Sequence, residues 1–322
     1  MENIAHSLLN WIPIKLIEKD NEIYFEWIYL GDLNYNEPFF DETIAKCRKL
    51  PYNSNWFKTV STLENLIDWS KELVAVEVKS LVFHVSRCGS TMLSQSLATS
   101  AENIVISEAP IIDQILRSYS FDLEKKTILL KSVIALLGQK RFPEQKNLIV
   151  KLDAWHIFNA PYLRSVFPET PFALLYRNPA EVLRSHQKMT GMHMVPNLLE
   201  PGIFGITSKE ISEISFHQYG ALVLEKYYQG FLDFNALDKN VIILNYNEGM
   251  RDVVERFISF INVEYSNNEL NQIYDRLKKH SKNEANIFNG DSYKDDVLLA
   301  DLSKAFLLHE KLNNCFVEDL AR

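Results

Sequence analysis

The sequence predicts a doubly wound α/β fold built on a mainly parallel, five-stranded sheet. Five short runs rich in Val, Ile and Leu alternate with longer stretches that have helical periodicity. Short runs that are apolar on both faces are typical of parallel strands covered by helices on each side. The expected strands are 81–85, 104–106, 147–152, 171–176 and 240–245. In sheets of this class, ligands bind at the carboxyl ends of the strands.

Composition and charge narrow the class of protein. Of the 322 residues, 47% are hydrophobic and 24% are charged, as in a globular protein. Cys47, Cys88 and Cys315 are far apart and match no zinc spacing, which favours a reducing compartment. The formal net charge of -8 disfavours a nucleic-acid partner. The chain shows no signal-peptide pattern and no apolar run of roughly 20 residues, so we expect a cytoplasmic protein without a membrane span.

Residues 1–78 differ from residues 79–322 in their sequence pattern, and we expect them to form an extension that packs on the main domain. Aromatic and β-branched residues flank a polar turn, which predicts a hairpin. Pro13 near its start suits an edge strand. Two helices should follow the hairpin. These elements are expected at 12–17 with 22–29, at 41–49 and at 62–73.

Helical stretches are expected between and after the strands of the main domain. They lie at 91–99, 111–119, 123–137, 179–189 and, as one long helix, near 208–234. Thr207 and Glu210 have capping-box spacing at the start of the long helix. Helices dominate after residue 250, and the stretch 297–320 is amphipathic, so the C-terminal part should be helical.

The segment 81–98 is typical of a strand, a tight loop and a helix. Gly89 lets the backbone approach a phosphate closely, and loop N–H groups with a helix N-terminus form an anion site. Arg87 adds positive charge, and Ser90 and Thr91 add hydroxyls. The segment lacks the first glycine and the lysine of the loop GxxxxGK[ST]. The alternative is an ordinary strand-to-helix turn.

A second strand end carries a matching pattern. Ser86-Arg-Cys-Gly-Ser-Thr91 and Arg177-Asn-Pro-Ala-Glu-Val-Leu-Arg-Ser185, in this order, resemble the two donor-binding motifs of the sulfotransferase family. These enzymes use 3′-phosphoadenosine-5′-phosphosulfate (PAPS). The resemblance covers residues 80–290 and implies a P-loop-type α/β fold, PAPS as co-substrate, and a small-molecule or peptide acceptor.

The resemblance also implies which residues bind the donor. The first motif wraps the 5′-phosphosulfate, and the Arg and Ser of the second hold the 3′-phosphate. Near the C-terminus, the strand end at residues 244–249 resembles an element that passes adenine, and residues 280–291 take the place of a basic loop. The implied set is Arg87, Cys88, Gly89, Ser90, Thr91, Arg177, Ser185, Tyr246 and Lys282.

The implied catalytic residues follow the strand 147–152. Where the cytosolic enzymes have Lys-x-His, this chain has Lys151 and Asp153, with His156 further on. Lys151 and Arg87 are implied near the bridging oxygen, and Asp153 is the predicted base because it shares a strand face with Lys151.

The other candidates for the base are Glu108 and His156. Each of the three has a structural alternative: Asp153 can cap the following helix or pair with Lys151. Glu108 can be a favourable charge at a helix N-terminus, and His156 can be hydrogen-bonded to backbone.

Two other functions stay open. One is a P-loop kinase that uses ATP and magnesium on the same fold, and the other is a scaffold without catalysis. We expect no metal, because a sulfuryl group carries a single negative charge and no magnesium-binding Asp accompanies the loop. Residues 1–78 and 186–206 should shape the acceptor pocket. The aromatic and methionine residues of these segments are compatible with a lipid, a phenol, a sugar or a peptide as acceptor. No feature of the sequence sets the oligomeric state.

Overall fold

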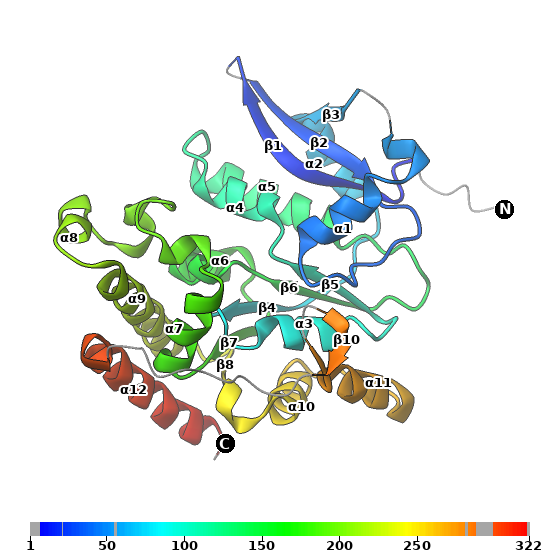
Figure 1. Ribbon diagram of the computed structural model, residues 1–322. Coiled ribbons are helices and arrows are strands. Elements are labelled where there is room, and N and C mark those ends of the chain that lie inside the picture. Colours follow the sequence, from blue (N-terminus) through cyan, green and yellow to red (C-terminus); the bar gives the residue numbers. More distant parts are fainter. Residues whose placement is uncertain (1–6, 21, 55–56, 281–282, 288–298, 321–322) are drawn as a thin grey trace. The chain divides into compact units, whose positions relative to one another are not determined.

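The five hydrophobic runs form one sheet in the computed structural model, which describes residues 7–20, 22–54, 57–280, 283–287 and 299–320. The strand order is β5-β6-β4-β7-β8 (Figure 1). The pairs β5–β6, β4–β7 and β7–β8 are parallel. This confirms the predicted α/β fold. The strands are β4 (Val78–His84), β5 (Asn103–Ser107), β6 (Asn147–Lys151), β7 (Phe172–Tyr176) and β8 (Val241–Asn245).

The strand order reverses at β4. The chain places β5 and β6 on one side of β4 and then β7 and β8 on the other. In doubly wound sheets, ligands bind outside the carboxyl ends of the strands at such a reversal. The loop that follows β4 is therefore where the fold itself favours a binding site.

The chain divides into two compact units. Unit 1 consists of Met1–Ser80, Ser94–Lys151 and Asn267–Arg276, and unit 2 consists of Leu81–Leu93, Leu152–Ser266 and Leu277–Arg322. Unit 1 contains β5 and β6, whereas unit 2 contains β7, β8 and the second half of β4. The boundary near residue 78 between extension and main domain stays a prediction.

Unit 1 contains the expected hairpin. Strand β1 (Trp11–Lys19) pairs antiparallel with β2 (Glu22–Tyr29), and β3 (Thr59–Thr62) adds a third strand beside β2. β1 is an edge strand, and its register shifts between Pro13 and Lys15; edge strands and such irregularities are the places where a sheet tolerates proline. The helices of this unit are α1 (Phe40–Cys47), α2 (Leu63–Glu72), α4 (Pro110–Arg117), α5 (Leu123–Leu137) and most of α11 (Asn267–Leu277).

Unit 2 contains most of the helices that follow β6, and its longest helix differs from the prediction. The expected helix near 208–234 is two helices, because Ser215 and Gln218 form a second capping box that begins α9. The C-terminal helix α12 lies along α9 (Figure 1), and Lys304 pairs with Glu225 at 3.1 Å. The helices are α6 (Ala160–Val166), α7 (Pro179–Lys188), α8 (Ser208–Ser212), α9 (Phe216–Leu237), α10 (Met250–Phe260) and α12 (Ser303–Leu320).

Within the described ranges, no helix combines the length and the hydrophobicity that a membrane crossing requires.

Candidate functional site

The loop between β4 and α3 (Ser90–Leu97) turns sharply in unit 2. Arg87 and Gly89 have positive φ values of 61° and 87°. The carbonyl of Gly89 accepts hydrogen bonds from the N–H groups of Met92 (2.9 Å) and Leu93 (3.1 Å), which starts the helix at the loop. Tight turns of this kind, followed directly by a helix N-terminus, present backbone N–H groups to an anion.

An aromatic ring covers this loop. A Cβ atom built on Gly89 would lie 2.5 Å from Cδ2 of Tyr246 and 2.9 Å from Sδ of Met250. Both distances are shorter than any ordinary carbon contact. Gly89 is therefore needed for its conformation and for the close approach of Tyr246, which begins the short 3-10 turn Tyr246–Glu248 after β8.

Arg177 stands between β7 and α7. Asn178 caps the helix by accepting from the N–H of Ala180 at 3.0 Å, and Pro179 occupies the first helical position. The Arg177 side chain is 7% exposed, and its Nε donates to Oε2 of Glu181 at 2.7 Å. A carboxylate one helical turn further along thus holds the guanidinium in place.

Arg177 also connects the two motifs. Its Nη1 donates to the carbonyl of Arg87 at 3.3 Å, and its Cζ lies 4.2 Å from the centre of the Tyr246 ring. Since the same ring covers Gly89, the second motif, the loop and the end of β8 form one cluster in unit 2. We call Arg87, Gly89, Arg177 and Tyr246 the anion cluster.

The other predicted donor-binding residues of unit 2 lie on the same elements. Nη2 of Arg87 donates to the carbonyl of Met189 at 2.5 Å, just beyond the end of α7. Cys88 and Ser90 are buried, whereas Thr91 is half-buried in the first turn of α3. Ser185 is half-buried on α7. Lys282 lies outside the described residues.

Lys151 and Glu108 form an ion pair in unit 1. Ser107 and Lys151 are register partners at the ends of β5 and β6, so Glu108 follows directly. Nζ of Lys151 lies 2.8 Å from Oε1 of Glu108, and the N–H of Glu108 donates to the Lys151 carbonyl at 2.8 Å. The Lys151 side chain is 1% exposed and its Nζ lies 5.1 Å from the centre of the Phe39 ring.

Asp153 lies beyond the end of β6, which stops at Lys151. It occupies the N-cap of the 3-10 helix Ala154–Asn159 and forms a capping box with His156. The N–H of Asp153 donates to Nδ1 of His156 at 3.3 Å, and Nε2 of His156 lies 3.9 Å from Oδ2 of Asp153. The capping alternative is therefore observed for Asp153, while its role as a base stays a prediction.

Sequence reasoning missed three residues that hold the anion cluster and the lysine pair. Glu181 could have been found, because it stands four residues after Arg177, the usual spacing of a helical ion pair. Tyr228, whose hydroxyl donates to the carbonyl of Arg177 at 2.7 Å, comes from α9 and gives no local signal. Neither does Phe39, which depends on the packing of α1.

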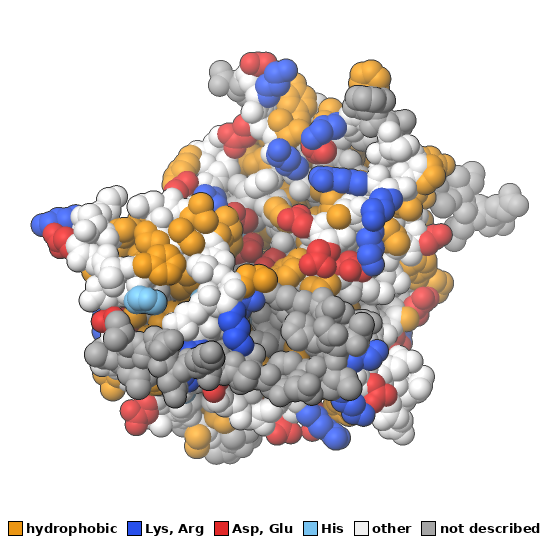
Figure 2. Space-filling view, viewed as in Figure 1, with side chains coloured by type: hydrophobic (Ala, Val, Ile, Leu, Met, Phe, Trp, Pro, Cys, Tyr) orange, Lys and Arg blue, Asp and Glu red, His pale blue; other side chains and the backbone are white. Residues whose placement is uncertain are grey.

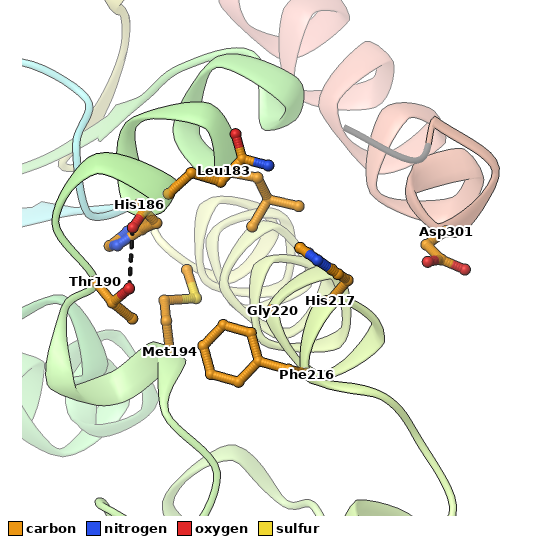
Figure 3. Close-up of a pocket in the computed structure, with 9 residues that line it drawn as sticks. Leu183, His186, Thr190, Met194, Phe216, His217, Gly220 and Asp301 are labelled. Atoms are coloured by element: carbon orange, nitrogen blue, oxygen red, sulfur yellow. Dashed lines mark hydrogen bonds between the residues drawn. The ribbon is translucent and has the colours of Figure 1, made fainter. Parts of the chain in front are cut away.

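A small pocket lies beside the end of α7, in the segment 186–206 that was expected to shape the acceptor site. Its volume is about 50 Å³. Figure 3 shows Leu183, Met194 and Phe216 facing one space, and Thr190 donates to the carbonyl of His186 at 3.0 Å. Sites for drug-sized ligands hold about 300–1,000 Å³, so this pocket suits one small apolar group. The remaining lining residues are Gln187, His217, Gly220 and Asp301.

No protein-family model matches the sequence, and no curated protein matches it. Among solved structures, the chain is similar to sulfotransferase STF1 from Mycobacterium tuberculosis, with 12% identity, coverage of 78% of this chain and 79% of that chain, and a TM-score of 0.42.

Two further solved structures are similar to the chain. The sulfotransferase domain from the curacin biosynthetic pathway has 15% identity, coverage of 74% of this chain and 99% of that chain, and a TM-score of 0.45. A mouse sulfotransferase complexed with PAP has 14% identity, coverage of 80% and 91%, and a TM-score of 0.37. The function proposed below rests on the residues of this chain.

Proposed function

We propose that the protein transfers a sulfuryl group from PAPS to a hydroxyl or an amine of an acceptor. The observation that carries the proposal is the anion cluster, in which Arg177 donates to the Arg87 carbonyl and stacks on Tyr246. The two motifs, ninety positions apart in the chain, thereby supply one tight loop and one buried cationic group, and the end of β8 adds one aromatic ring. Such a set suits a nucleotide that carries phosphates at two positions.

The reaction needs positioning and charge stabilisation more than covalent chemistry. The acceptor oxygen or nitrogen attacks sulfur, the bond between sulfur and the bridging oxygen breaks, and adenosine 3′,5′-bisphosphate (PAP) leaves. Negative charge builds on the bridging oxygen, where cationic donors have their largest effect. We assign Arg87 and Lys151 to that oxygen, with hydroxyl donors from Ser90 and Thr91.

The 3′-phosphate is assigned to Arg177 and Ser185. Burial of the guanidinium supports this role, because charge-assisted hydrogen bonds are stronger where water is excluded. ATP has no 3′-phosphate, so this assignment separates the proposed donor from the donor of a kinase.

Asp153 is the proposed base. Nδ1 of His156 accepts a hydrogen bond from the Asp153 N–H, which assigns the proton of the neutral ring to Nε2. His156 therefore has no lone pair to offer unless its capping bond breaks. The Glu108 carboxylate pairs with Lys151, so we assign Glu108 to the positioning of that lysine. The Asp153 side chain, 14% exposed, is the remaining candidate.

The test compares three ligands and one turnover assay. Calorimetry and thermal unfolding with PAP, AMP and ATP plus magnesium, each at the same concentration, should show the largest stabilisation with PAP, which is about 2.7 kcal/mol if that concentration is 100 times the Kd of PAP. Incubation of labelled PAPS with host extract should yield a labelled acceptor, and EDTA should leave that turnover unchanged.

Two outcomes would contradict the proposal. Stabilisation by ATP only in the presence of magnesium, together with turnover that requires a divalent ion, would assign the chain to the kinases. Stabilisation by PAP without any labelled product would leave a donor-binding scaffold.

A further inference from the structure

The C-terminal helix places one amide against the ends of two neighbouring strands. Oδ1 of Asn313 on α12 accepts from the Tyr176 hydroxyl at 2.6 Å and from Nδ2 of Asn245 at 3.0 Å. Tyr176 and Asn245 are register partners and are the last residues of β7 and β8. The residues that follow them are Arg177 and Tyr246, whose guanidinium and ring stack in the anion cluster. Asn313 thus bridges the strand pair from which that stack projects.

The other end of the amide is held on α12 itself. Nδ2 of Asn313 lies 3.4 Å from Nδ1 of His309, one turn earlier, so the nitrogen faces the helix and the oxygen faces the strands. The His309 ring packs against Tyr176 and Tyr228, with centroid distances of 5.5 and 6.2 Å. Tyr228 in turn donates to the Arg177 carbonyl. The orientation of the Asn313 amide is therefore defined by its surroundings.

α12 reaches the turn after β8 at a second point. The Arg256 guanidinium lies 4.6 Å from the Phe316 ring and donates to both carboxylate oxygens of Glu248, at 3.2 and 3.1 Å. Oε1 of Glu248 also accepts from the N–H of Asn245 at 3.2 Å. The turn that carries Tyr246 is consequently fixed on both sides by contacts that lead to one helix.

The Asn313 oxygen is the acceptor for two donors, the Tyr176 hydroxyl and the Asn245 amide. Tyr176 is fully buried, and burial raises the pKa of its hydroxyl, so the group stays protonated and donates. A buried donor that loses its acceptor costs about 1–3 kcal/mol. Without the Asn313 oxygen, we expect the strand ends to shift until Tyr176 and Asn245 find other partners. That shift would separate Arg177 from Tyr246.

We propose that Asn313 is a positioning residue for the anion cluster: it holds the last β7–β8 pair so that Arg177 stacks on Tyr246 and meets the 3′-phosphate. The identification of the anion as a 3′-phosphate rests on the proposed function. The statement that Asn313 fixes the ends of β7 and β8 does not.

The experiment compares Asn313→Leu with Asn314→Leu, the same change at the exposed neighbour on α12. Without ligand, hydrogen exchange of residues 176–178 and 245–250 should rise in Asn313→Leu and stay unchanged in Asn314→Leu. Asn313→Leu should weaken PAP about tenfold and AMP less than about twofold, since the buried Tyr176 hydroxyl loses its acceptor and only PAP carries the 3′-phosphate. Asn313→Asp keeps acceptor oxygens and should restore PAP affinity to within about threefold.

The outcomes of these measurements distinguish the positioning role of Asn313 from the proposed function. Equal losses for PAP and AMP, or unchanged exchange in Asn313→Leu, would overturn the positioning role. If the unaltered protein binds no PAP, the proposed function fails, and the exchange data alone then test the hold on the strands. If Asn313→Leu does not fold, Tyr176→Phe removes one of the two donors and should weaken PAP about threefold in the same selective way.

Discussion

Arg177 and Lys151 are both buried cations at the end of a parallel strand, yet the protein holds them differently. Lys151 has its carboxylate partner on the neighbouring strand end, at Glu108, and lies over one ring. Arg177 has its partner on the helix that follows it, at Glu181 on α7, together with a backbone carbonyl and a stacked ring. An ammonium is a compact point charge, whereas a guanidinium is a planar fork with five donors. A guanidinium can therefore be fixed by several groups at once and still suit a phosphate.

The two carboxylates also differ in backbone conformation. Glu181 is an ordinary helical residue, but Glu108 has a φ of 56°, which costs a non-glycine residue about 1–3 kcal/mol. A strained backbone conformation thus places the Glu108 carboxylate beside Lys151, whereas the Glu181 carboxylate reaches Arg177 from an unstrained helix. We infer from this contrast that function depends on the position of the Lys151 ammonium more strongly than it would on a lysine in an ordinary buried ion pair.

The largest expected effect would test which of two carboxylates, Asp153 or Glu108, acts as the base. Asp153→Asn should lower the rate of sulfuryl transfer about 10²–10⁴-fold with PAP binding retained, because the acceptor loses its base. Single-turnover kinetics with labelled PAPS would measure the chemical step. Glu108→Gln is the control: near-normal turnover in Asp153→Asn, with turnover lost in Glu108→Gln, would make Glu108 the base.

The next effect concerns stability and separates the two partners of the lysine pair. Glu108→Gln removes the carboxylate that lies 2.8 Å from Nζ of Lys151, whose side chain is 1% exposed, and should cost about 3–5 kcal/mol of unfolding free energy because a buried ion pair is broken. Lys151→Met leaves Glu108, whose side chain is 22% exposed and can be hydrated, and should cost clearly less. Urea unfolding of both variants and of the double variant measures this. Equal losses would mean that burial of the lysine does not set the cost.

Arg177→Ala should weaken PAP far more than AMP. A charge-assisted contact contributes about 1.5–3 kcal/mol, so the ratio of the two dissociation constants should change about 10- to 150-fold. Calorimetry with both nucleotides gives the ratio. Equal losses for PAP and AMP would remove the 3′-phosphate from Arg177.

The smallest effect is a pH dependence of stability beneath the anion cluster. Burial lowers the pKa of His309, and the charge of Glu181 opposes this only in part. The unfolded chain then binds the proton more readily, so His309 contributes stability above pH 6.5 that is lost as the pH falls through the folded pKa. Between pH 7.5 and 5.5, urea midpoints should fall more for the unaltered protein than for His309→Gln. Parallel curves would assign the dependence to other groups.

Much of the fold could be predicted because its signals are local. Each strand of the central sheet contains a short apolar run, and each lies within a few residues of its predicted position. β3 was not predicted, because Thr59–Thr62 is polar and mostly exposed and owes its conformation to pairing with β2. The turn Ala154–Asn159 and α6 were also missed, since the capping box at Asp153 departs from the usual residue types.

The site was predictable only where a motif is contiguous. The loop geometry and the position of Arg177 follow from short segments, but the pair of Lys151 with Glu108 depends on β5 lying next to β6. The expectation that Asp153 lies on the same strand as Lys151 was wrong, because β6 ends at Lys151. Periodicity predicted α12 without indicating that Asn313 faces the strand ends.

The contact of Gly89 with Tyr246 has a consequence for how the protein is made. The anion cluster draws on residues 87–89, 177 and 246, and Asn313 adds a fourth position far along the chain. Contacts so distant in sequence form late, because loop closure must precede them. During translation, at about 5–20 residues per second, the loop between β4 and α3 therefore emerges many seconds before Tyr246 and Asn313 can complete the anion cluster. We expect PAP to stabilise full-length chains and to leave ribosome-bound chains that end before α12 unaffected.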